Sequence, residues 1–334
     1  MSTGKSIVDR IDAVTHISDI RLQMGGIQPA PKSVKIELTN KCNLNCKYCA
    51  TSMREHKGKA EMDFWLFQRI TEDMRVSGVE EIGLFFLGES MMAPALLNKA
   101  ISWCKKEMDF PYVFLTSNAT LGDAEFVEML MASGLDSLKW SVNFASEEKF
   151  KEVTQSSANL FHRALKNIKE AYWVRFNGNY KTMLSASSIL YDEDYRNASD
   201  RFLDDYVRPY VDRHYWLPLY QMAMYHDHVK KTMGYVPTAG NMGRIDDSTG
   251  KPNRKPLPCW TAFTEGHIRV DGNVSACCFG NDARFDMGVL DGTNFMRQWN
   301  SAKFAELRKA QLRTRTEGQD ALKGTPCEVC VVYG

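Results

Sequence analysis

Three cysteines, Cys42, Cys46 and Cys49, lie close together in the spacing Cys-x-x-x-Cys-x-x-Cys. Thiolates spaced in this way can converge on one metal centre, and soft sulfur ligands favour zinc or an iron-sulfur cluster. Structural zinc usually takes four ligands in paired groupings, and the sequence offers no fourth ligand nearby in such a grouping. The loop therefore predicts a site with three cysteine ligands and one open position.

The cysteine loop follows a hydrophobic strand, 34–39, and an aromatic residue, Tyr48, precedes its last cysteine. In these features it resembles the signature of the radical S-adenosylmethionine (SAM) enzymes. The resemblance implies that the three cysteines hold a 4Fe-4S cluster whose free iron chelates SAM, and that Tyr48 belongs to the cofactor site. In that family one electron cleaves SAM to methionine and a 5'-deoxyadenosyl radical, which abstracts a hydrogen atom from the substrate. A zinc knuckle and buried free thiols are the alternatives.

Length, composition and charge are those of a globular protein. The chain has 334 residues, of which 44% are hydrophobic and 25% charged, and its length suggests about two domains. A net charge of +1 gives no global attraction to nucleic acid or to a membrane surface. The sequence has neither an N-terminal apolar core of signal-peptide length nor a membrane span. We therefore expect a cytoplasmic protein whose nine cysteines are thiols or metal ligands, with no nucleic-acid or membrane partner.

Strand-like and helix-like segments alternate through the first two thirds of the chain. The predicted strands are 34–39, 81–87, 112–116, 137–142, 181–190 and 214–221. The predicted helices are 62–76, 94–106, 124–132, 161–173 and 199–210. Such α/β units imply a parallel sheet with chemistry at the carboxyl ends of its strands. The residues alone allow an open doubly wound sheet or a barrel, and the resemblance favours the partial (β/α)6 radical SAM barrel.

Polar residues follow three of these predicted strands. Gly88 and Glu89 resemble the family motif whose backbone and carboxylate bind the amino group of SAM, and the alternative is a surface turn with a helix-capping Ser90. Small polar residues lie at the ends of the next two strands, where the family contacts the ribose and methionine parts of SAM: Ser117, Asn118, Ser141 and Asn143. Ordinary turn chemistry is the alternative for these four positions.

The C-terminal quarter changes character after a Pro- and Lys-rich segment, 249–258. A hairpin pattern covers 266–278 around Asp271-Gly272, and a helix is predicted over 294–310. Four thiolates can be drawn from this quarter of the chain: Cys259, Cys277 or Cys278, Cys327 and Cys330. Four thiolates suffice for an iron-sulfur cluster or for a structural zinc ion.

The C-terminal segment resembles the SPASM and "twitch" extensions of radical SAM enzymes. Cys259, Gly272 and Cys277 fit the opening of the family pattern, whereas the further cysteines of a full SPASM pattern are absent because the chain ends shortly after Cys330. The resemblance thus implies one auxiliary 4Fe-4S cluster bound by Cys259, Cys277, Cys327 and Cys330, with zinc as the alternative. We place domain boundaries at 1–33 for an N-terminal extension, 34–248 for the radical SAM core and 249–334 for the auxiliary cluster domain.

Two cysteines remain outside these sets. Cys104 lies within a predicted amphipathic helix and is interpreted as a buried small hydrophobic residue. Cys278 either points away from Cys277 into packing, by strand alternation, or donates a hydrogen atom to a substrate radical. His214 and Tyr215 are the most site-like of the imidazole and aromatic residues, although packing explains both.

The resemblance also bounds the reaction. Relatives of the twitch type act on an aminocyclitol alcohol, and SPASM relatives mature peptides and proteins. We expect a small polar substrate, such as a sugar or aminocyclitol, that is oxidised or epimerised, with a peptide or protein substrate as the alternative. The family further implies an electron donor such as flavodoxin or ferredoxin. A zinc-stabilised binding module, which would be colourless and would not turn over SAM, is the alternative from another class.

Overall fold

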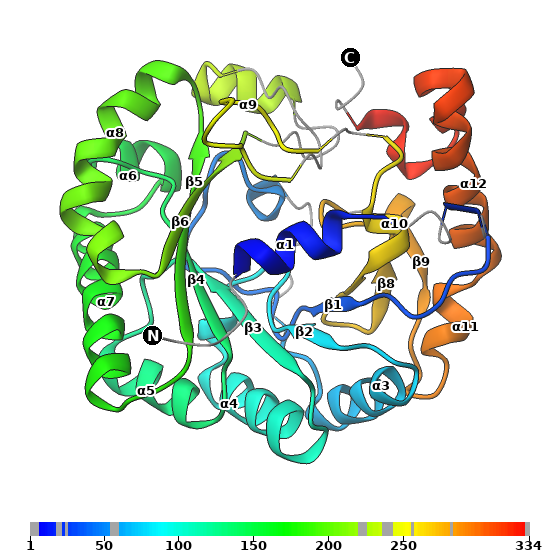
Figure 1. The fold of residues 1–334 in the computed structure, drawn as a ribbon, viewed down its shortest axis with the longest axis horizontal. Helices are drawn as coiled ribbons and strands as arrows, with labels where there is room; N and C mark the ends of the chain where they lie inside the picture. Colours follow the sequence, from blue (N-terminus) through cyan, green and yellow to red (C-terminus); the bar gives the residue numbers. More distant parts are fainter. Residues whose placement is uncertain are drawn as a thin grey trace.

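The computed structural model describes residues 7–17, 22–23, 26–53, 60–219, 226–235, 243–254, 257–280 and 283–330. A nine-stranded sheet forms its centre, with the strand order β6-β5-β4-β3-β2-β1-β7-β8-β9 (Figure 1). Strands β1 to β6 pair in parallel, as the alternating pattern predicts. Their bounds are Ser33–Ile36, Glu81–Gly83, Tyr112–Ser117, Ser137–Ser141, Met183–Leu190 and Arg213–Pro218. The sheet is curved but not closed, so the α/β prediction of a partial barrel is confirmed.

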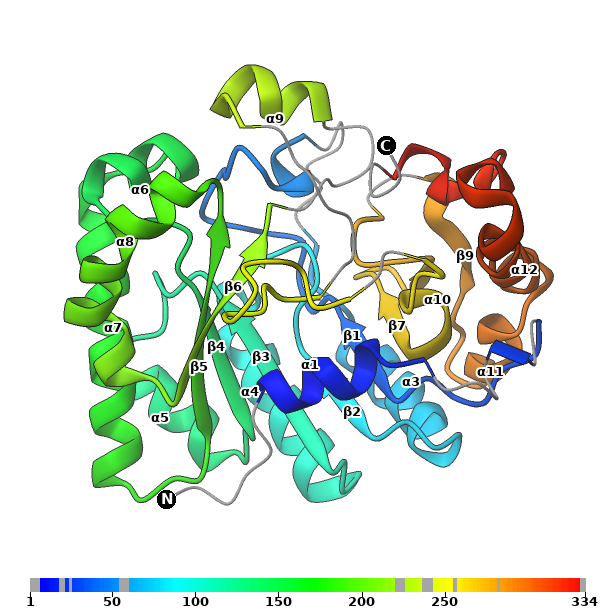
Figure 2. The same ribbon diagram turned by 45° about the horizontal axis from the view of Figure 1, so that its top comes forward.

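Helices cover the outer face of the parallel strands (Figures 1 and 2). They are α3 (Phe64–Val76), α4 (Pro94–Ser102) with a π-helical turn (Trp103–Glu107), α5 (Ala124–Ala132), α6 (Glu147–Thr154), α7 (Ala158–Asn177) and α8 (Glu193–Tyr206). Aspartates cap three of them: the carboxylates of Asp63, Asp123 and Asp192 accept hydrogen bonds from backbone amides of the first turn. The helix predicted to begin at residue 199 begins at Glu193, because Asp192 supplies the cap.

The C-terminal hairpin continues the same sheet. Strand β7 (Glu265–Ile268) pairs in parallel with β1, and β8 (Asn273–Ser275) and β9 (Asp286–Val289) add antiparallel neighbours. The prediction that strand structure reaches Cys278 is wrong, because β8 ends at Ser275 and the next residues turn. The predicted helix over 294–310 is two helices, α11 (Phe295–Trp299) and α12 (Ala302–Glu317), because Ser301 caps the second.

Helix α1 (Ile7–Thr15) lies across the open side of the barrel, between β6 and the short helix α10 (Thr261–Thr264), as Figures 1 and 2 show. Its apolar residues Val8 and Ile11 pack against an aromatic cluster of β3 and β6: Tyr112, Phe114 and Tyr215. At its other end the Thr264 hydroxyl donates a hydrogen bond of 2.6 Å to the Val14 carbonyl. The N-terminal segment thus closes the barrel interior from the side.

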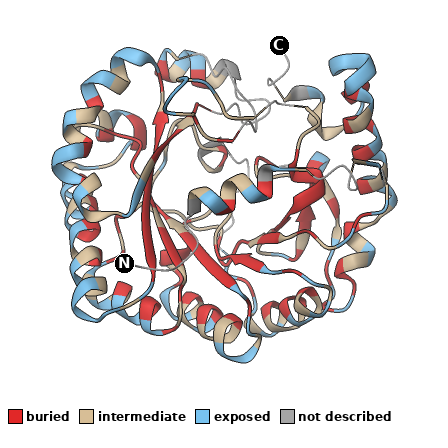
Figure 3. Ribbon diagram, in the orientation of Figure 1, coloured by how far each residue is buried: buried red, intermediate tan, exposed pale blue. Residues whose placement is uncertain are grey.

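Buried residues concentrate on the strands and on the helix faces turned toward them (Figure 3). The largest fully buried side chains include Trp140, Trp299, Phe67 and Phe263. Cys104 is completely buried in this core, as expected for a small hydrophobic residue. Within the described ranges, no helix combines the length and apolarity that crossing a membrane requires.

Candidate active site

The cysteine loop begins where β1 ends, at the carboxyl edge of the parallel strands. Cys42, Cys46 and Cys49 are half-buried, and none of them forms a disulfide. Burial, with further contributions from the neighbouring Glu89 and Cys49, raises the pKa of the Cys42 thiol to about 12. Burial, followed by Cys49 and Cys42, likewise raises the pKa of Cys46. The three sulfurs therefore lie within electrostatic reach of one another, and a cation at their centre would favour their thiolate forms.

This donor set fits a cluster. Among the described residues, no three His, Cys, Asp or Glu side chains stand close enough around one point to hold a single metal ion. In a 4Fe-4S cluster each thiolate ligates a different iron, so the sulfurs need not meet at one point. Three half-buried thiols on one loop suit such a cluster, with one iron left for another ligand.

The turn after β2 is built against the cysteine loop. The Glu89 amide donates a hydrogen bond of 2.8 Å to the Lys41 carbonyl. Glu89 is buried, and its carboxylate accepts hydrogen bonds from the amides of Met91 (3.1 Å) and Asn118 (2.8 Å). Burial raises its pKa above the usual range. The alternative of a surface turn capped by Ser90 is wrong, because Glu89 supplies the cap and Ser90 is buried.

The turn lies so close to the cysteine loop that only glycine fits at position 88. A Cβ atom at Gly88 would lie 2.0 Å from the Thr39 carbonyl oxygen. We expect Gly88→Ala to push the turn away from the cysteine loop, to destabilise the fold by about 1–3 kcal/mol, and to weaken SAM binding about tenfold or more. Equilibrium binding of SAM to the reconstituted protein measures the effect. Gly26→Ala is the matched control, because its Cβ would meet only the Ala305 side chain, at 3.3 Å; equal SAM affinity in both variants would contradict the prediction.

Asn118 ties the end of β3 to the same loop. Its side-chain amide donates a hydrogen bond of 2.9 Å to Asn43, and its oxygen accepts one of 3.0 Å from the Thr120 amide. It also hydrogen-bonds the Cys42 thiol. Ser117 is bonded locally instead, to the sulfur of Met91 at 3.3 Å and to the amide of Ala119. The cofactor-binding role of both residues stays a prediction.

Asn143 and Tyr48 connect the end of β4 to the cysteine loop. The Asn143 amide group donates a hydrogen bond of 2.5 Å to the Tyr48 hydroxyl, and its oxygen accepts one from the Ile189 amide. Tyr48 in turn hydrogen-bonds Cys46. Ser141 ends β4 on the same face of the strand as Lys139, which lines the barrel interior. The residues predicted from β1 to β4 therefore gather at one edge of the sheet.

The auxiliary cysteines gather around a glutamine of α12. Burial raises the pKa of Cys277, and the neighbours Cys278, Cys327 and Cys330 raise it further. Burial and then Cys259 and Cys330 do the same for Cys327. The Gln311 amide group donates a hydrogen bond of 3.2 Å to the Cys327 sulfur, and its oxygen accepts one of 2.9 Å from the Cys259 amide.

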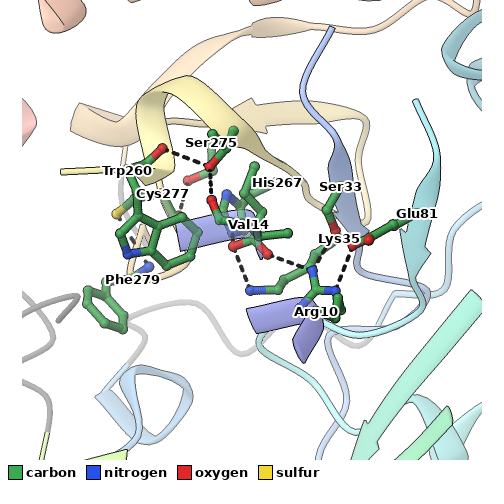
Figure 4. A network of polar contacts seen from close by, with 12 residues as sticks. Arg10, Val14, Ser33, Lys35, Glu81, Trp260, His267, Ser275, Cys277 and Phe279 are labelled. Carbon is green, nitrogen blue, oxygen red and sulfur yellow. Dashed lines mark hydrogen bonds and ion pairs between the residues drawn. The ribbon is translucent and has the colours of Figure 1, made fainter. Parts of the chain in front are cut away.

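This glutamine was missed by the sequence analysis. Gln311 is fully buried on the inner face of α12, and nothing in the sequence marks it, because the predicted helix stops one position earlier. Figure 4 shows Cys277 beside Phe279, whose amide donates a hydrogen bond of 3.4 Å to the Cys277 sulfur. Cys259, Cys277, Cys327 and Cys330 thus lie within electrostatic reach of one another, and their role as ligands of an auxiliary cluster stays a prediction.

Cys278 lines a cavity of about 150 Å³ in the barrel interior. Residues of five described strands, of α1 and of the C-terminal hairpin share this cavity, among them Arg10, Lys35, Phe85, Phe114, Thr116, Lys139, Tyr215, Trp260 and Glu265. Cys278 thus borders the cavity, and its role as a hydrogen donor stays a prediction.

Of the two site-like residues on β6, only Tyr215 lines the cavity. His214 lies 3.0 Å from the Ser188 hydroxyl, and burial lowers its pKa to about 4. His214 therefore packs as a neutral side chain, as the simpler interpretation holds.

Two segments of the chain match known protein families. Residues 36–185 match the model of the radical SAM superfamily, and residues 259–331 match the model of SPASM, an iron-sulfur cluster-binding domain. An uncharacterized protein of Methanocaldococcus jannaschii is 33% identical over 41% of this chain and 42% of its own length. The PqqA peptide cyclase of Gluconobacter oxydans is 28% identical over 38% of this chain and 32% of its own length. The chain thus spans less than half the length of these two relatives.

Solved structures share the fold at low sequence identity. BtrN in complex with AdoMet and 2-DOIA is 15% identical with a TM-score of 0.56, covering 91% of this chain and 93% of that one. Streptococcus suis SuiB bound to S-adenosylmethionine is 13% identical with a TM-score of 0.61, covering 93% and 74%. The protein anSMEcpe with bound AdoMet is 12% identical with a TM-score of 0.61, covering 90% and 93%.

Proposed function

Because the chain carries a radical SAM domain followed by a SPASM domain, which imply 4Fe-4S clusters and SAM, we propose that it abstracts a hydrogen atom from a small polar substrate and so oxidises or epimerises it. The cluster on Cys42, Cys46 and Cys49 would supply the electron that cleaves SAM. The observation that carries the proposal is the packing of the Gly88-Glu89 turn against the cysteine loop, at the carboxyl edge of a sheet whose strands also line an interior cavity.

The chain's own residues bind and orient SAM in this proposal. Glu89 is the carboxylate for the SAM amino group, and its two backbone hydrogen bonds fix its position before SAM arrives. Asn118 and Asn143 hold the cysteine loop through Asn43 and Tyr48. Ser141, which ends β4 on the same face as Lys139, would contact SAM at this edge of the sheet. Water is excluded by α1, which covers the side of the barrel.

The cavity supports a small substrate. A volume of about 150 Å³ accommodates a molecule of about one ring, or one side chain of a larger molecule. A peptide substrate is the second candidate, favoured by the partial match to a PqqA peptide cyclase. Structural neighbours were solved with 2-DOIA and with the precursor peptide SuiA, so the fold serves both classes. The two substrate classes are separated by testing which addition product formation requires. A low-mass metabolite fraction should suffice for a small substrate, and a peptide should be needed for a peptide substrate.

Replacing Cys278 distinguishes an oxidation from an epimerisation, because only an epimerisation needs a hydrogen donor. An epimerase returns a hydrogen atom to the opposite face of the substrate radical, and the weak S–H bond of a thiol can supply it. The thiyl radical that remains is restored by one electron from the reductant and a proton from water. An oxidation instead releases an electron and a proton from the substrate radical and needs no hydrogen donor. The position of Cys278 beside the cavity suits the donor role.

We therefore expect Cys278→Ala to leave SAM cleavage unchanged and to abolish product only if the reaction is redox-neutral. Deuterium incorporated from heavy water into the product, and lost in Cys278→Ala, would support the donor role. Unchanged turnover of Cys278→Ala would contradict a hydrogen-donor role for Cys278. Cys104→Ala is the matched control, because Cys104 is buried in the core away from the cavity.

A further inference from the structure

The cavity inside the barrel is lined by charged side chains on several sides. Arg10 of α1, Lys35 of β1, Lys139 of β4 and Glu265 of β7 all face it. Aromatic rings complete the wall, and the Arg10 guanidinium stacks on Phe114 at 3.9 Å from the ring centroid. Charges in such a low-dielectric space are costly unless each has a partner.

Two of the three cations have carboxylate partners. Arg10 contacts Glu81 at 2.8 Å and Glu265 at 3.0 Å, and Lys35 contacts Glu265 at 2.8 Å (Figure 4). Burial opposes the ionisation of Glu265, but Lys35, His267 and Arg10 together hold its pKa well below the usual range. These two carboxylates are thus already engaged with Arg10 and Lys35.

Lys139 is the cation left over. No carboxylate of the described residues lies within ion-pair distance of its ammonium group, and the other charges acting on it are the cations Lys35 and Arg10. Burial, followed by these two cations, lowers the pKa of Lys139 to about 7. Its remaining accessible surface faces the cavity. On β5 its register neighbour Ser185 carries a buried hydroxyl without a hydrogen-bond partner in the described structure.

We propose that the cavity binds an anionic group of the substrate, a carboxylate or a phosphate, through the ammonium group of Lys139, which lines it, with the buried hydroxyl of its β5 neighbour Ser185 as a second donor once the anion is bound. An anion beside Lys139 would favour its charged form and would balance the third cation, for which Glu81 and Glu265 supply no partner. Ammonium and hydroxyl donors are the groups that hydrogen-bond such oxygens best. The proposal rests on the proposed function, because it names the class of substrate that the radical chemistry would act on.

The position of Lys139 suits substrate anchoring. It lies two residues before Ser141 on β4, on the inner face of the strand and below the edge where the cofactor residues gather. Across the cavity, Cys278 marks the wall that belongs to the C-terminal hairpin. A substrate held by its anionic group at Lys139 would thus lie between the SAM edge and Cys278.

Anion binding is tested first without turnover, on the reconstituted protein. Inorganic phosphate and succinate serve as charged probes and myo-inositol as the neutral one, with thermal unfolding followed as a function of probe concentration. We expect wild type to respond to a charged probe and Lys139→Met to need at least about tenfold more of it, because one charge-assisted hydrogen bond is lost. Lys139→Arg should retain the response. General salt stabilisation by phosphate is common to all variants and therefore cancels in the comparison.

Lys166→Met on the exposed face of α7 is the matched control and should behave as wild type. Lys139→Met should fold, because it removes a buried charge without a partner. Equal responses of wild type and Lys139→Met to both anions would overturn the proposal. So would a response of wild type to myo-inositol alone.

Turnover gives the second arm. A deproteinised low-mass extract of the natural host is split on an anion exchanger, and each fraction is tested for stimulation of 5'-deoxyadenosine formation. We expect stimulation from the retained fraction, its loss in Lys139→Met and its recovery in Lys139→Arg. Loss of stimulation after phosphatase treatment assigns a phosphate, and its persistence assigns a carboxylate.

The two arms also separate the two proposals. Stimulation by the unretained fraction, undiminished in Lys139→Met, overturns the anionic substrate but leaves the radical chemistry standing. Absence of 5'-deoxyadenosine under every condition overturns the radical chemistry, whereas the binding arm still decides whether Lys139 holds an anion.

Discussion

Replacing Cys42, Cys46 and Cys49 together by alanine should abolish 5'-deoxyadenosine formation while the protein stays folded. Without the three thiolate ligands the loop can no longer hold the cluster, and the iron that would chelate SAM is lost with it. The loop keeps its place through backbone hydrogen bonds, from the Asn45 amide to the Thr154 carbonyl at 3.1 Å and from the Lys47 amide to the Val153 carbonyl at 2.9 Å. None of these bonds uses a cysteine side chain, so the core is untouched.

Iron content should fall in the same variant from about eight to about four atoms per chain, because one of two four-iron clusters is removed. Circular dichroism checks that the fold persists. Cys104→Ala is the control and should keep all of its iron, since Cys104 lies in the apolar core. Persistent 5'-deoxyadenosine in the triple variant would refute the assignment of this loop.

The double change of Cys327 and Cys330 to alanine should also remove about four irons, but with loss of solubility. Cys327 lies on a short 3₁₀ turn, Pro326–Val329, and Cys330 directly follows that turn. The other two cysteines of the predicted set are Cys277, which follows β8, and Cys259, which precedes α10. A cluster would thus fasten the end of the chain to the hairpin and to α12, where the Gln311 side chain already links the Cys259 backbone amide to the Cys327 sulfur. Metal binding of this kind is coupled to folding.

Cys278→Ala provides the control for this double variant, because the residue is adjacent to Cys277 but faces the cavity. It should keep all of its iron and its solubility. A wild-type chain that reproducibly holds only about four irons after anaerobic reconstitution would contradict the auxiliary cluster.

The strand-helix alternation predicts most of the barrel from the sequence because each strand is an apolar run between helices of regular period. The least accurate bounds are those set by a polar contact that no pattern reveals. Because Asp192 caps α8, that helix begins earlier in the chain than predicted, and the cap at Ser301 divides the predicted C-terminal helix in two. The pairing of β7 with β1 joins residues far apart in the sequence, so the continuity of the sheet across the predicted domain boundary is visible only in three dimensions.

The cysteine loop and the Gly88-Glu89 turn could be predicted because their chemistry resides in local spacing. The tight contact between Gly88 and the Thr39 carbonyl explains why that position is glycine. The interior charges could not be predicted in this way. Lys139 stands in an apolar strand as a single charged residue, and only the fold brings it near Arg10 and Lys35.

The most direct measurement is the formation of 5'-deoxyadenosine by the anaerobically reconstituted wild-type chain. With SAM and dithionite, without any substrate, we expect a brown protein that releases 5'-deoxyadenosine and methionine in equal amounts. A colourless protein that holds zinc and leaves SAM intact would contradict this expectation.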